Sequence, residues 1–304
     1  MMITNFAEMM TSARNFGPVP VAVAAADDPE VLESIVEARK EGVVNGYLVG
    51  DQAAIESIAG RKGLDLAGFN IIHEPDHPQA ARHVVALVRD GKAAIVVKGQ
   101  LKTADLLKPV LDNNTGLRDK NLLSHVALFE IAGRSQLLYI SDSGVVLYPT
   151  LEQKLDIIHN VVDAAHCFGL TLPKVAILGA TDRVSLDAPR SVEALLLSQM
   201  ARQGAVKGAI VEGPLPLDVV INPRAAQIKD IETAMPGTAD ILIVPGVDAG
   251  NIMCKAMQYL AGAQMAGMVV GARAPIIINS RADDARTRFL SLGMAVVWSA
   301  AFAD

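Results

Sequence analysis

The sequence has little of what marks secreted proteins. It contains two cysteines, Cys167 and Cys254, which stand far apart and form no CxxC pair. This usage favours reduced thiols in a cytoplasmic protein over a disulfide framework. The N-terminus also lacks a basic segment followed by an apolar core, so we expect no signal peptide.

Long apolar runs and blocks of basic residues are also missing. The uncharged run 289–303 is shorter than the roughly 18 residues that a membrane span needs, and it is typical of a buried terminal helix. The formal net charge is -6 and no Lys/Arg cluster occurs, which argues against nucleic acid as a partner. A phosphorylated small molecule stays possible, because a local basic pocket needs only a few cations. We therefore predict no membrane and no nucleic-acid partner.

Several sequence signatures of nucleotide, hydrolase and metal chemistry are absent. The patterns GxGxxG, GxxxxGK[ST] and GxSxG do not occur. The segment His73–His77 matches the zinc-protease pattern HExxH, but Pro75 lies inside the helix which that pattern requires. We therefore predict a strand-to-loop turn at this segment and no metal site.

What the sequence does contain is a large apolar fraction in an alternating arrangement. Of its 304 residues, 51% are hydrophobic and 20% charged, which is enough for a sizeable core and about two domains. Short apolar runs such as Val19–Ala25 and Ala93–Val97 alternate with helix-period segments such as 29–40 and 78–90. This alternation predicts the α/β class, with mainly parallel sheets covered by helices on both faces.

The alternation is interrupted once, which suggests where the domains divide. The runs 124–130 and 136–140 resemble a hairpin, and helices and strands alternate again after residue 150. We place the boundary near residue 140 and expect the last strand and helix to return to the first domain. The predicted domains are 1–139 plus 278–304, and 140–277, with a ligand cleft between them.

The most informative segment follows the apolar run Ile276–Ile278, which is typical of a buried strand. Ser280, Arg281, Asp283 and Asp284 come directly after it, where a helix is expected to begin. They bring a hydroxyl, a guanidinium and two carboxylates to the carboxyl end of a strand, where open α/β sheets bind ligands. Arginine can bind phosphate and a carboxylate can accept a proton. The alternative is a helix start, with Ser280 or Asp283 as N-cap and a solvated Arg281.

A second candidate anion site follows the apolar run that ends at Lys98. Thr103 is a possible N-cap of the next helix, and Lys108 and Arg118 supply cations nearby in the sequence. A strand end, a helix N-terminus and fixed cations together favour an anion. The alternative is a capped helix with solvated lysines.

A third candidate lies where an apolar run breaks at Pro245. Gly250 and Asn251 are expected to begin a helix that carries Lys255 one turn further on. Gly250 would allow close backbone approach, Asn251 could cap the helix, and the free N–H groups favour a phosphate or carbonyl oxygen. A tight loop that needs no ligand is the alternative. We expect all three candidates at the carboxyl edges of sheets, where one cleft could gather them.

Several segments, in this order, carry a resemblance to a known family. They are KGQLKTADLLKPVL, GLRDKNLLSHVALFE, SDSGVVLYPT, VEGPLPLD, ADILIVPGVDAGNIMCKA and INSRADD. Together they resemble the phosphate acetyl/butyryl transferase family, and its phosphate butyryltransferase branch most. The resemblance implies two three-layer α/β domains of isopropylmalate dehydrogenase-like architecture, with the active-site cleft between them.

The same resemblance implies an activity. Members of that family move a short acyl group, butyryl or acetyl, reversibly between coenzyme A and inorganic phosphate. We therefore expect acyl-CoA, phosphate and acyl phosphate as partners, coenzyme A as a substrate, no tightly bound cofactor and no metal. A homodimer or higher homo-oligomer is also implied.

By this resemblance, Ser280 matches the active-site serine and Arg281 the arginine that holds the acyl phosphate. Arg118 and Lys108 match cationic positions that line the substrate site. Thr287 departs from the pattern, because acetyl-transferring members carry a catalytic aspartate at that position. The resemblance therefore leaves the general base open.

Two kinds of group could replace that aspartate. Asp283 and Asp284 each lie about one turn from Ser280 and could accept the thiol proton. Alternatively, Arg281 could lower the pKa of the thiol by its charge.

Two other functions remain open. One is a metal- and NAD-dependent 2-hydroxy acid dehydrogenase of similar fold, which needs an acidic cluster and an arginine-rich segment that the sequence does not clearly show. The other is a non-catalytic acyl-CoA-binding protein, which Thr287 in the position of the base would explain.

Overall fold

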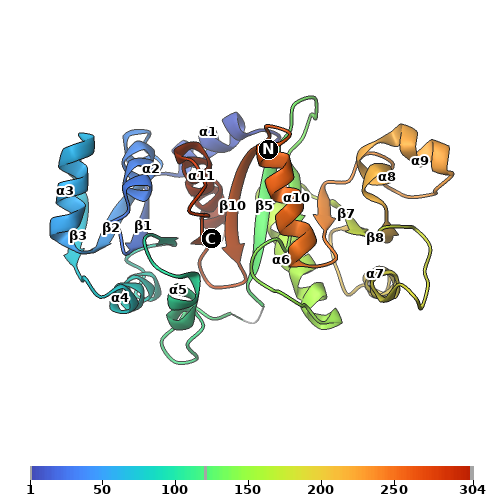
Figure 1. Cartoon of the computed structure of the whole chain (residues 1–304), viewed down its shortest axis with the longest axis horizontal. Helices are drawn as coiled ribbons and strands as arrows, with labels where there is room; N and C mark the ends of the chain where they lie inside the picture. The colour runs from blue at the N-terminus through green and yellow to red at the C-terminus, as the bar shows by residue number, and fades with distance from the viewer. Residues whose placement is uncertain (1, 120–121, 302–304) are drawn as a thin grey trace. The chain divides into compact units, whose positions relative to one another are not determined.

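The structure is a computed structural model that describes residues 2–119 and 122–301. Its chain divides into two compact units: unit 1 comprises Met1–Asn5 and Leu122–Met265, and unit 2 comprises Phe6–Asn121 and Ala266–Asp304. In each unit a mainly parallel sheet is combined with helices (Figure 1). The predicted α/β class is therefore confirmed.

Unit 2 contains twelve elements, counted over the described residues. In chain order they are α1 (Phe6–Phe16), β1 (Val19–Ala24), α2 (Pro29–Lys40), β2 (Val44–Gly50), α3 (Gln52–Lys62), β3 (Phe69–His73), α4 (His77–Arg89), β4 (Ile95–Lys98), α5 (Thr103–Val110), β10 (Gln264–Val270, which starts in unit 1), β11 (Ile276–Ile277) and α11 (Ala285–Ala301). The strand order is β3-β2-β1-β4-β11-β10. Neighbouring strands are parallel except β10 and β11, which are antiparallel.

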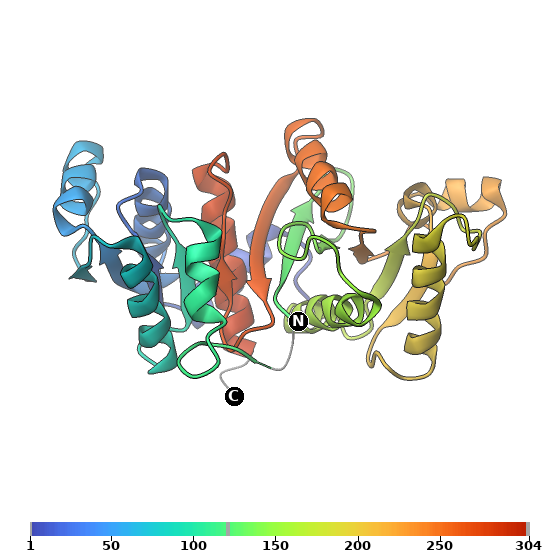
Figure 2. The same cartoon turned by 60° about the horizontal axis from the view of Figure 1, so that its bottom comes forward.

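The helices of unit 2 form two layers. Helices α4 and α5 lie on one face of the sheet, while α1, α2, α3 and α11 lie on the other (Figures 1 and 2). Helix α2 begins where Asp28 accepts hydrogen bonds from the N–H groups of Glu30 and Val31, both at 3.1 Å, and Pro29 pre-sets the first helical turn. Helix α11 is buried all round from Thr287 to Trp298, which confirms the predicted buried terminal helix over its described residues.

Unit 1 contains ten elements, again counted over the described residues. They are β5 (Ser124–Glu130), β6 (Leu138–Ser141), α6 (Leu151–Cys167), β7 (Lys174–Leu178), α7 (Pro189–Arg202), β8 (Ile210–Leu215), α8 (Leu217–Ile221), α9 (Pro223–Lys229), β9 (Ile241–Ile243) and α10 (Val247–Tyr259). The strand order is β5-β6-β9-β7-β8, and only the β5–β6 pair is antiparallel. Its core includes Phe129, Ile140 and Leu242.

The units divide at residues 122 and 266, whereas the sequence analysis placed the boundaries at residues 140 and 278. The hairpin accounts for the first difference, because β6 pairs in parallel with β9 and keeps β5 beside it in unit 1. Strand β10 accounts for the second, because it pairs with β11 and so belongs mostly to unit 2. Backbone pairing therefore decides both boundaries: β6 and β9 are far apart in the chain, whereas β10 and β11 are neighbours in it.

Two further sequence predictions concern function classes. His73 ends β3 and His77 begins α4 after the N-cap Asp76, so the two histidines do not share a helical face. The predicted strand-to-loop turn is confirmed. Over residues 2–119 and 122–301, no helix combines the length and apolar character needed to cross a membrane.

Candidate active site

Three neighbouring parallel strands of unit 2 end in polar side chains. The register places Ala24 of β1 opposite Lys98 of β4, and Val97 of β4 opposite Ile277 of β11. Asp28 follows β1, Lys98 closes β4, and Ser280 follows β11. The structure therefore brings Lys98 and the Ser280 segment to one sheet edge, the carboxyl edge at which α/β sheets bind ligands.

Ser280 opens a tight turn that is held by hydrogen bonds from several sides. Its backbone N–H donates to Oδ2 of Asp283 at 2.8 Å, and the Asp283 N–H donates to the Ser280 carbonyl oxygen at 3.1 Å. The Ala282 N–H lies 3.4 Å from Ser280 Oγ, which accepts from it. Asp283 is buried, whereas the side chains of Ser280 and Arg281 are exposed. The turn thus presents a hydroxyl and a guanidinium to solvent.

The buried side chain of Arg288 anchors this turn through hydrogen bonds to its backbone. It is only 6% exposed, and its guanidinium donates from Nη2 to the Ser280 carbonyl at 3.0 Å and from Nε to the Asp283 carbonyl at 3.2 Å. Bonds from a charged donor are stronger than neutral ones. Sequence analysis missed this residue. The available signal was a second arginine, two residues after Arg286, directly before the apolar run that starts at Phe289.

The two predicted carboxylates have structural partners. Asp283 bonds to the Ser280 N–H, while Oδ1 of Asp284 accepts from the Thr287 N–H at 2.8 Å. Asp284, rather than the predicted Ser280 or Asp283, therefore caps the first turn of α11. Thr287 itself is buried in that helix.

Lys98 lies in a cluster of charges. Its ammonium donates to the carbonyl oxygens of Gly99 at 3.0 Å and Leu101 at 2.9 Å. Burial lowers the pKa of Lys98; the Asp28 carboxylate opposes this effect, and the cations Arg281 and Arg288 add to it. Asp28, which the sequence analysis did not select, thus belongs to the cluster. The sequence signal for it was an N-cap residue just after a strand.

Gly99 explains how the loops after β1 and β4 can lie so close together. The Gly99 N–H donates to the Ala24 carbonyl at 2.8 Å, and the Gln100 N–H donates to the Ala25 carbonyl at 2.8 Å. A Cβ atom at Gly99 would stand 2.0 Å from the Ala25 oxygen, so only glycine fits without moving the backbone. This close crossing positions Lys98.

Three further candidates of unit 2 are Thr103, Lys108 and Arg118, and the two cations among them are not gathered at this edge. Thr103 is the first residue of α5, and the N-cap is Lys102 without a side-chain hydrogen bond, so the predicted Thr103 cap is wrong. Lys108 lies in the last turn of α5, exposed and about one and a half turns from Thr103. Arg118 forms a β-bridge with Ala272, in the connection that precedes β11. Arg118 therefore lies near the amino end of β11, whereas Ser280 follows the carboxyl end of that strand.

In unit 1, Gly250, Asn251 and Lys255 all lie on α10. This helix begins at Val247 with Gly246 as N-cap, so the prediction that Gly250 and Asn251 begin and cap it is wrong. Asn251 is exposed, and the ammonium of Lys255 lies 5.5 Å from the centre of the ring of Tyr259. The first turn of α10 remains without a side-chain cap.

Gly250 allows α10 to pack closely against another loop of unit 1. A Cβ atom there would stand 2.9 Å from the Asp142 carbonyl oxygen and 3.0 Å from Cα of Ser143. The close approach that the glycine allows is therefore to the loop after β6. Loop 141–143 lies at the carboxyl end of β6, beside the end of β9.

That loop is organised by the buried Asp142. Its Oδ1 accepts from the N–H groups of His125 at 3.1 Å and Gly144 at 2.9 Å, and its Oδ2 accepts from Val146 at 2.7 Å. His125 Nδ1 lies 2.8 Å from Ser143 Oγ. The carboxylate thus acts as a backbone anchor, because buried charges need such hydrogen bonds.

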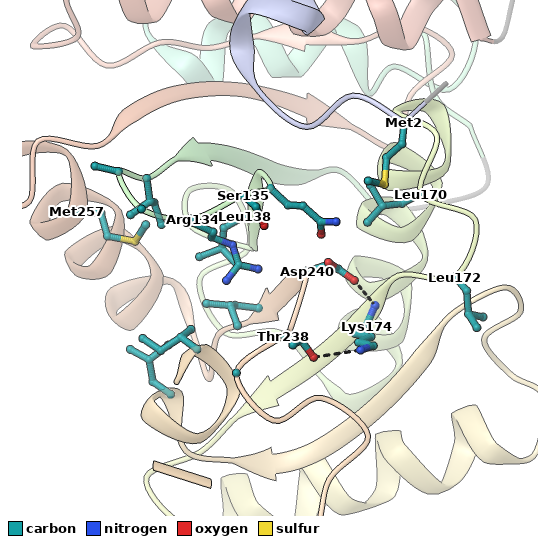
Figure 3. A pocket seen from close by; sticks show the side chains of 18 of the residues that line it. Met2, Arg134, Ser135, Leu138, Leu170, Leu172, Lys174, Thr238, Asp240 and Met257 are labelled. Carbon is teal, nitrogen blue, oxygen red and sulfur yellow. Dashed lines mark hydrogen bonds between the residues drawn. The ribbon is translucent and has the colours of Figure 1, made fainter. Parts of the chain in front are cut away.

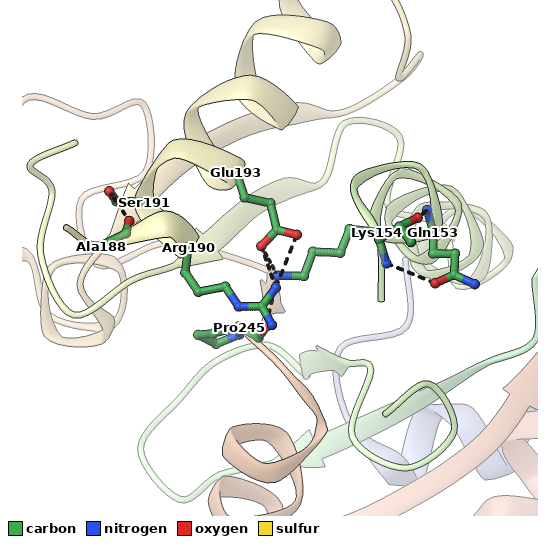
Figure 4. A network of polar contacts seen from close by, with 8 residues as sticks. Gln153, Lys154, Ala188, Arg190, Ser191, Glu193 and Pro245 are labelled. Carbon is green, nitrogen blue, oxygen red and sulfur yellow. Dashed lines mark hydrogen bonds and ion pairs between the residues drawn. The ribbon is translucent and has the colours of Figure 1, made fainter. Parts of the chain in front are cut away.

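A buried ion pair fixes the loop from which α10 begins. Lys154 has a side chain 3% exposed, and its ammonium bonds to Oε2 of Glu193 at 2.7 Å and to the Pro245 carbonyl at 2.9 Å (Figure 4). Arg190 contacts the same Glu193 oxygen at 3.0 Å. Pro245 is therefore tied to α6 and α7 by one cation.

Comparison with known proteins bears directly on these clusters. A family model described as phosphate acetyl/butyryl transferase matches residues 79–296, more than two thirds of the chain. The chain belongs to the phosphate acetyl/butyryl transferase family. The matched range includes Lys98, Ser280, Arg281 and Arg288.

Individual relatives agree with this assignment. The chain is 38% identical to the phosphate butyryltransferase of Clostridium acetobutylicum, covering 97% of this chain and 98% of that one. It is 37% identical to the phosphate acetyltransferase of Rhizobium meliloti, covering 98% and 94%. The structure of a branched-chain phosphotransacylase from Enterococcus faecalis superposes with a TM-score of 0.83 at 29% identity, covering 92% and 99%.

Membership in this family bears on the other two functions. Its named relatives are transferases, which favours neither a dehydrogenase nor a non-catalytic binding protein. Within residues 2–119 and 122–301, no three His, Cys, Asp or Glu side chains group as a metal site. The acyltransferase prediction is therefore confirmed at the level of the enzyme family.

Proposed function

We propose that the chain transfers a short acyl group, butyryl or acetyl, between coenzyme A and inorganic phosphate, with Ser280 and Arg281 at the reacting group. The observation that carries this proposal is the exposed Ser280–Arg281 pair at the carboxyl end of β11, fixed by Arg288 and next to Lys98. Membership in the transferase family supports the same chemistry.

In the direction of acyl-CoA formation, the thiolate sulfur of coenzyme A attacks the carbonyl carbon of the acyl phosphate. A C–S bond forms, and the C–O bond to phosphate then breaks, so that phosphate leaves with the electron pair. Arg281 pairs with the phosphate oxygens, and the Ser280 hydroxyl donates to the carbonyl oxygen as it gains charge. Both groups act where negative charge develops.

The thiol must lose a proton before it attacks. A free thiol has a pKa near about 8.5, so only a few per cent is ionised at neutral pH. Asp283 and Asp284 already bond to the backbone of the turn and helix, which favours the second alternative of the sequence analysis. In this proposal Arg281 and Lys98 stabilise the thiolate, and the proton passes to solvent. Asp284, which is exposed, is the remaining candidate for a general base.

The chain's own cysteines do not take part in this proposal. Burial raises the pKa of both the Cys167 and Cys254 thiols to about 11. A thiol with so high a pKa is a poor nucleophile at neutral pH. Acyl transfer is therefore proposed to be direct, from phosphate to coenzyme A.

Other predicted contacts are assigned by their place in the fold. Thr103 begins α5 after β4 and is proposed to face phosphate, and Asn251 and Lys255 of α10 are proposed to bind coenzyme A phosphates. Lys108 and Arg118 lie toward the other end of unit 2, so we propose that they bind a distal part of coenzyme A rather than the reacting group.

We also propose a homodimer or higher homo-oligomer. Helix α10 exposes Ile252 by 69% and Tyr259 by 56%, and Leu260 directly after it by 87%. An apolar strip of this kind is typical of a protein interface. Ile252→Glu with Leu260→Glu should shift the mass in light scattering toward the monomer. Because both cysteines are free thiols, we propose a cytoplasmic enzyme, and we also propose that it needs no tightly bound cofactor.

The decisive experiment is an acyl-transfer assay with defined substrates. Purified protein is given acetyl-, propionyl-, butyryl- or isobutyryl-CoA with phosphate, and thiol release is recorded with and without phosphate. We expect thiol release that depends on phosphate and that falls about 10²–10³-fold in Arg281→Ala. Turnover with none of the four substrates, in a folded protein, contradicts the proposal.

A further inference from the structure

A cavity of about 920 Å³ lies wholly within unit 1. It is lined at the amino ends of parallel strands, where Leu138 begins β6, Lys174 begins β7 and Asp240 precedes β9 (Figure 3). Ser143 and Gly250 lie at the carboxyl ends of β6 and β9 instead. The cavity therefore shares no lining residue with the proposed reaction site, because Lys98, Ser280 and Arg281 belong to unit 2.

Most of the cavity wall is apolar. It includes Leu138, Leu170, Leu217, Met253 and Met257. Methionine side chains are flexible and polarisable, so they can adapt to an apolar chain of variable shape. The volume lies near the upper end of the range of about 300–1,000 Å³ that is usual for small-molecule pockets.

One side of the cavity is charged. Arg134, Lys174 and Asp240 are its three lining residues with ionised side chains, and together they give two positive charges and one negative charge. Asp240 lies between the two cations and is 9% exposed. An anion of single charge would balance this group, whereas a cation would not.

All three of these charged groups already have partners in the chain. Oδ2 of Asp240 accepts from the Lys174 backbone N–H at 2.9 Å, and the Lys174 ammonium donates to Oγ1 of Thr238 at 3.0 Å (Figure 3). The Arg134 guanidinium donates from Nη2 to the Ala239 carbonyl. Its Nε is buried and has no acceptor among the described residues. Because buried polar groups in native structures are almost always bonded, this donor needs an explanation.

We propose that this cavity binds a monocarboxylate with an apolar chain, its carboxylate on Arg134 and its chain along Met253 and Met257. The guanidinium offers the fork geometry that carboxylates prefer. A dianion would be repelled by Asp240, and a neutral ligand would leave the net positive charge of Arg134, Lys174 and Asp240 unbalanced. The combination of one net positive charge and an apolar wall selects an amphipathic monoanion.

The test is titration calorimetry of the full-length protein with octanoate as the probe. We expect saturable binding of one octanoate per chain, at least tenfold tighter than that of octan-1-ol, octylamine or acetate. Arg134→Met should weaken it at least tenfold. Arg202→Met, which removes an exposed arginine of α7 in the same unit, should not change it. Arg281→Ala should also leave it unchanged, which separates this cavity from the proposed reaction site.

A second variant guards against misfolding of Arg134→Met, which also loses its bond to Ala239. Met257→Glu places a like charge beside the apolar chain and should weaken octanoate at least tenfold, while thermal melts verify folding. Unchanged octanoate binding in both folded variants overturns the proposal, as does equal binding of octylamine.

Light scattering adds a third outcome that overturns the proposal. In this outcome the Met257→Glu variant is a monomer and binds octanoate, whereas the native protein does not. A second copy of the chain would then occupy the cavity in the native protein. None of these readouts uses acyl transfer, so failure here is distinct from failure of the proposed function.

Discussion

The Arg288 guanidinium donates a hydrogen bond to the carbonyl oxygen of Ser280 at 3.0 Å, across eight residues of the chain. The same side chain bonds the Asp283 carbonyl at 3.2 Å. It therefore ties the exposed turn before α11 to the buried body of that helix. The candidate serine is held by a buried charge rather than by loop stiffness alone.

Arg288→Met should therefore lower activity through position rather than through lost substrate contact. Each lost bond to the charged donor costs about 1.5–3 kcal/mol, so the melting temperature should fall by several degrees. Misplacement of a reacting group by about 1 Å can cost roughly 10²-fold in rate, and we expect kcat to fall at least tenfold.

The readouts are thermal unfolding and steady-state kinetics with butyryl-CoA and phosphate. Arg288→Lys should restore part of kcat, because lysine keeps the charge. Arg286→Met, on the same helix but exposed, is the matched control. A folded Arg288→Met enzyme with native kcat contradicts the positioning role.

Arg281→Ala should lose activity and keep stability. The side chain is exposed, so its removal should change the free energy of unfolding by less than about 0.5 kcal/mol. Loss of a group that stabilises transition-state charge costs about 10²–10³-fold in kcat. Arg61→Ala, an exposed arginine at the end of α3, serves as the control and should react normally. An Arg281→Ala rate near that of Arg61→Ala would remove Arg281 from the mechanism.

The half-buried thiol of Cys167 and the buried thiol of Cys254 predict how stability depends on pH. An unfolded cysteine loses its proton near about pH 8.5–9, whereas Cys167 and Cys254 keep theirs until about pH 11. Between these values the unfolded chain binds fewer protons, so the free energy of unfolding falls as pH rises. Below about pH 8.5 both states are protonated and these thiols add no pH dependence.

Urea unfolding at pH 8 and pH 10.5 measures this effect. Cys254→Ala should flatten the loss of stability between the two values by about 1–2 kcal/mol relative to the native chain. Iodoacetamide at pH 8 should label neither thiol quickly and should not inactivate the enzyme. Rapid labelling with loss of activity would show that a reactive thiol takes part.

Local patterns predicted most of the elements. The apolar run Val19–Ala25 forms β1. The segment 29–40 forms α2, because the Asp28 cap and the apolar strip both favour a helix there. The strand end at Ser280 was predicted for the same reason, since three β-branched residues precede a polar cluster. These features depend only on residues close in the sequence.

Features that depend on distant partners were not predictable in this way. Gly250 resembled a helix start, but its missing Cβ serves the loop at Asp142, more than a hundred residues earlier. Arg288 and Lys98 form one cluster only because β11 pairs with β4. Arg118 is close to Lys98 in sequence, yet α5 carries the chain to the other end of the sheet.

Gly250→Ala should destabilise the protein, while Gly246→Ala should not. A Cβ at position 250 meets the Asp142 backbone oxygen at 2.9 Å, and backbone atoms cannot yield without moving the loop. Overpacking of this kind costs about 1–3 kcal/mol. At position 246 no atom lies within 4 Å and the backbone is extended, so alanine should cost less than about 1 kcal/mol. Equal melting temperatures of the two variants would contradict this account.

Lys154 and Glu193 should show strong coupling in a double-mutant cycle. Lys154→Met leaves Glu193 paired only with the half-exposed Arg190, and leaves the Pro245 carbonyl without its charged donor. Breaking a buried pair typically costs about 3–5 kcal/mol, and Arg190 should reduce this to about 2–4 kcal/mol.

The second half of the cycle is Glu193→Gln, alone and combined with Lys154→Met. Because the double variant removes both charges, it should be less destabilised than the sum of the single variants by at least about 1 kcal/mol in urea unfolding. Strict additivity would mean that the ammonium of Lys154 is held by Pro245 alone. In that case the pair would not be what fixes the start of α10.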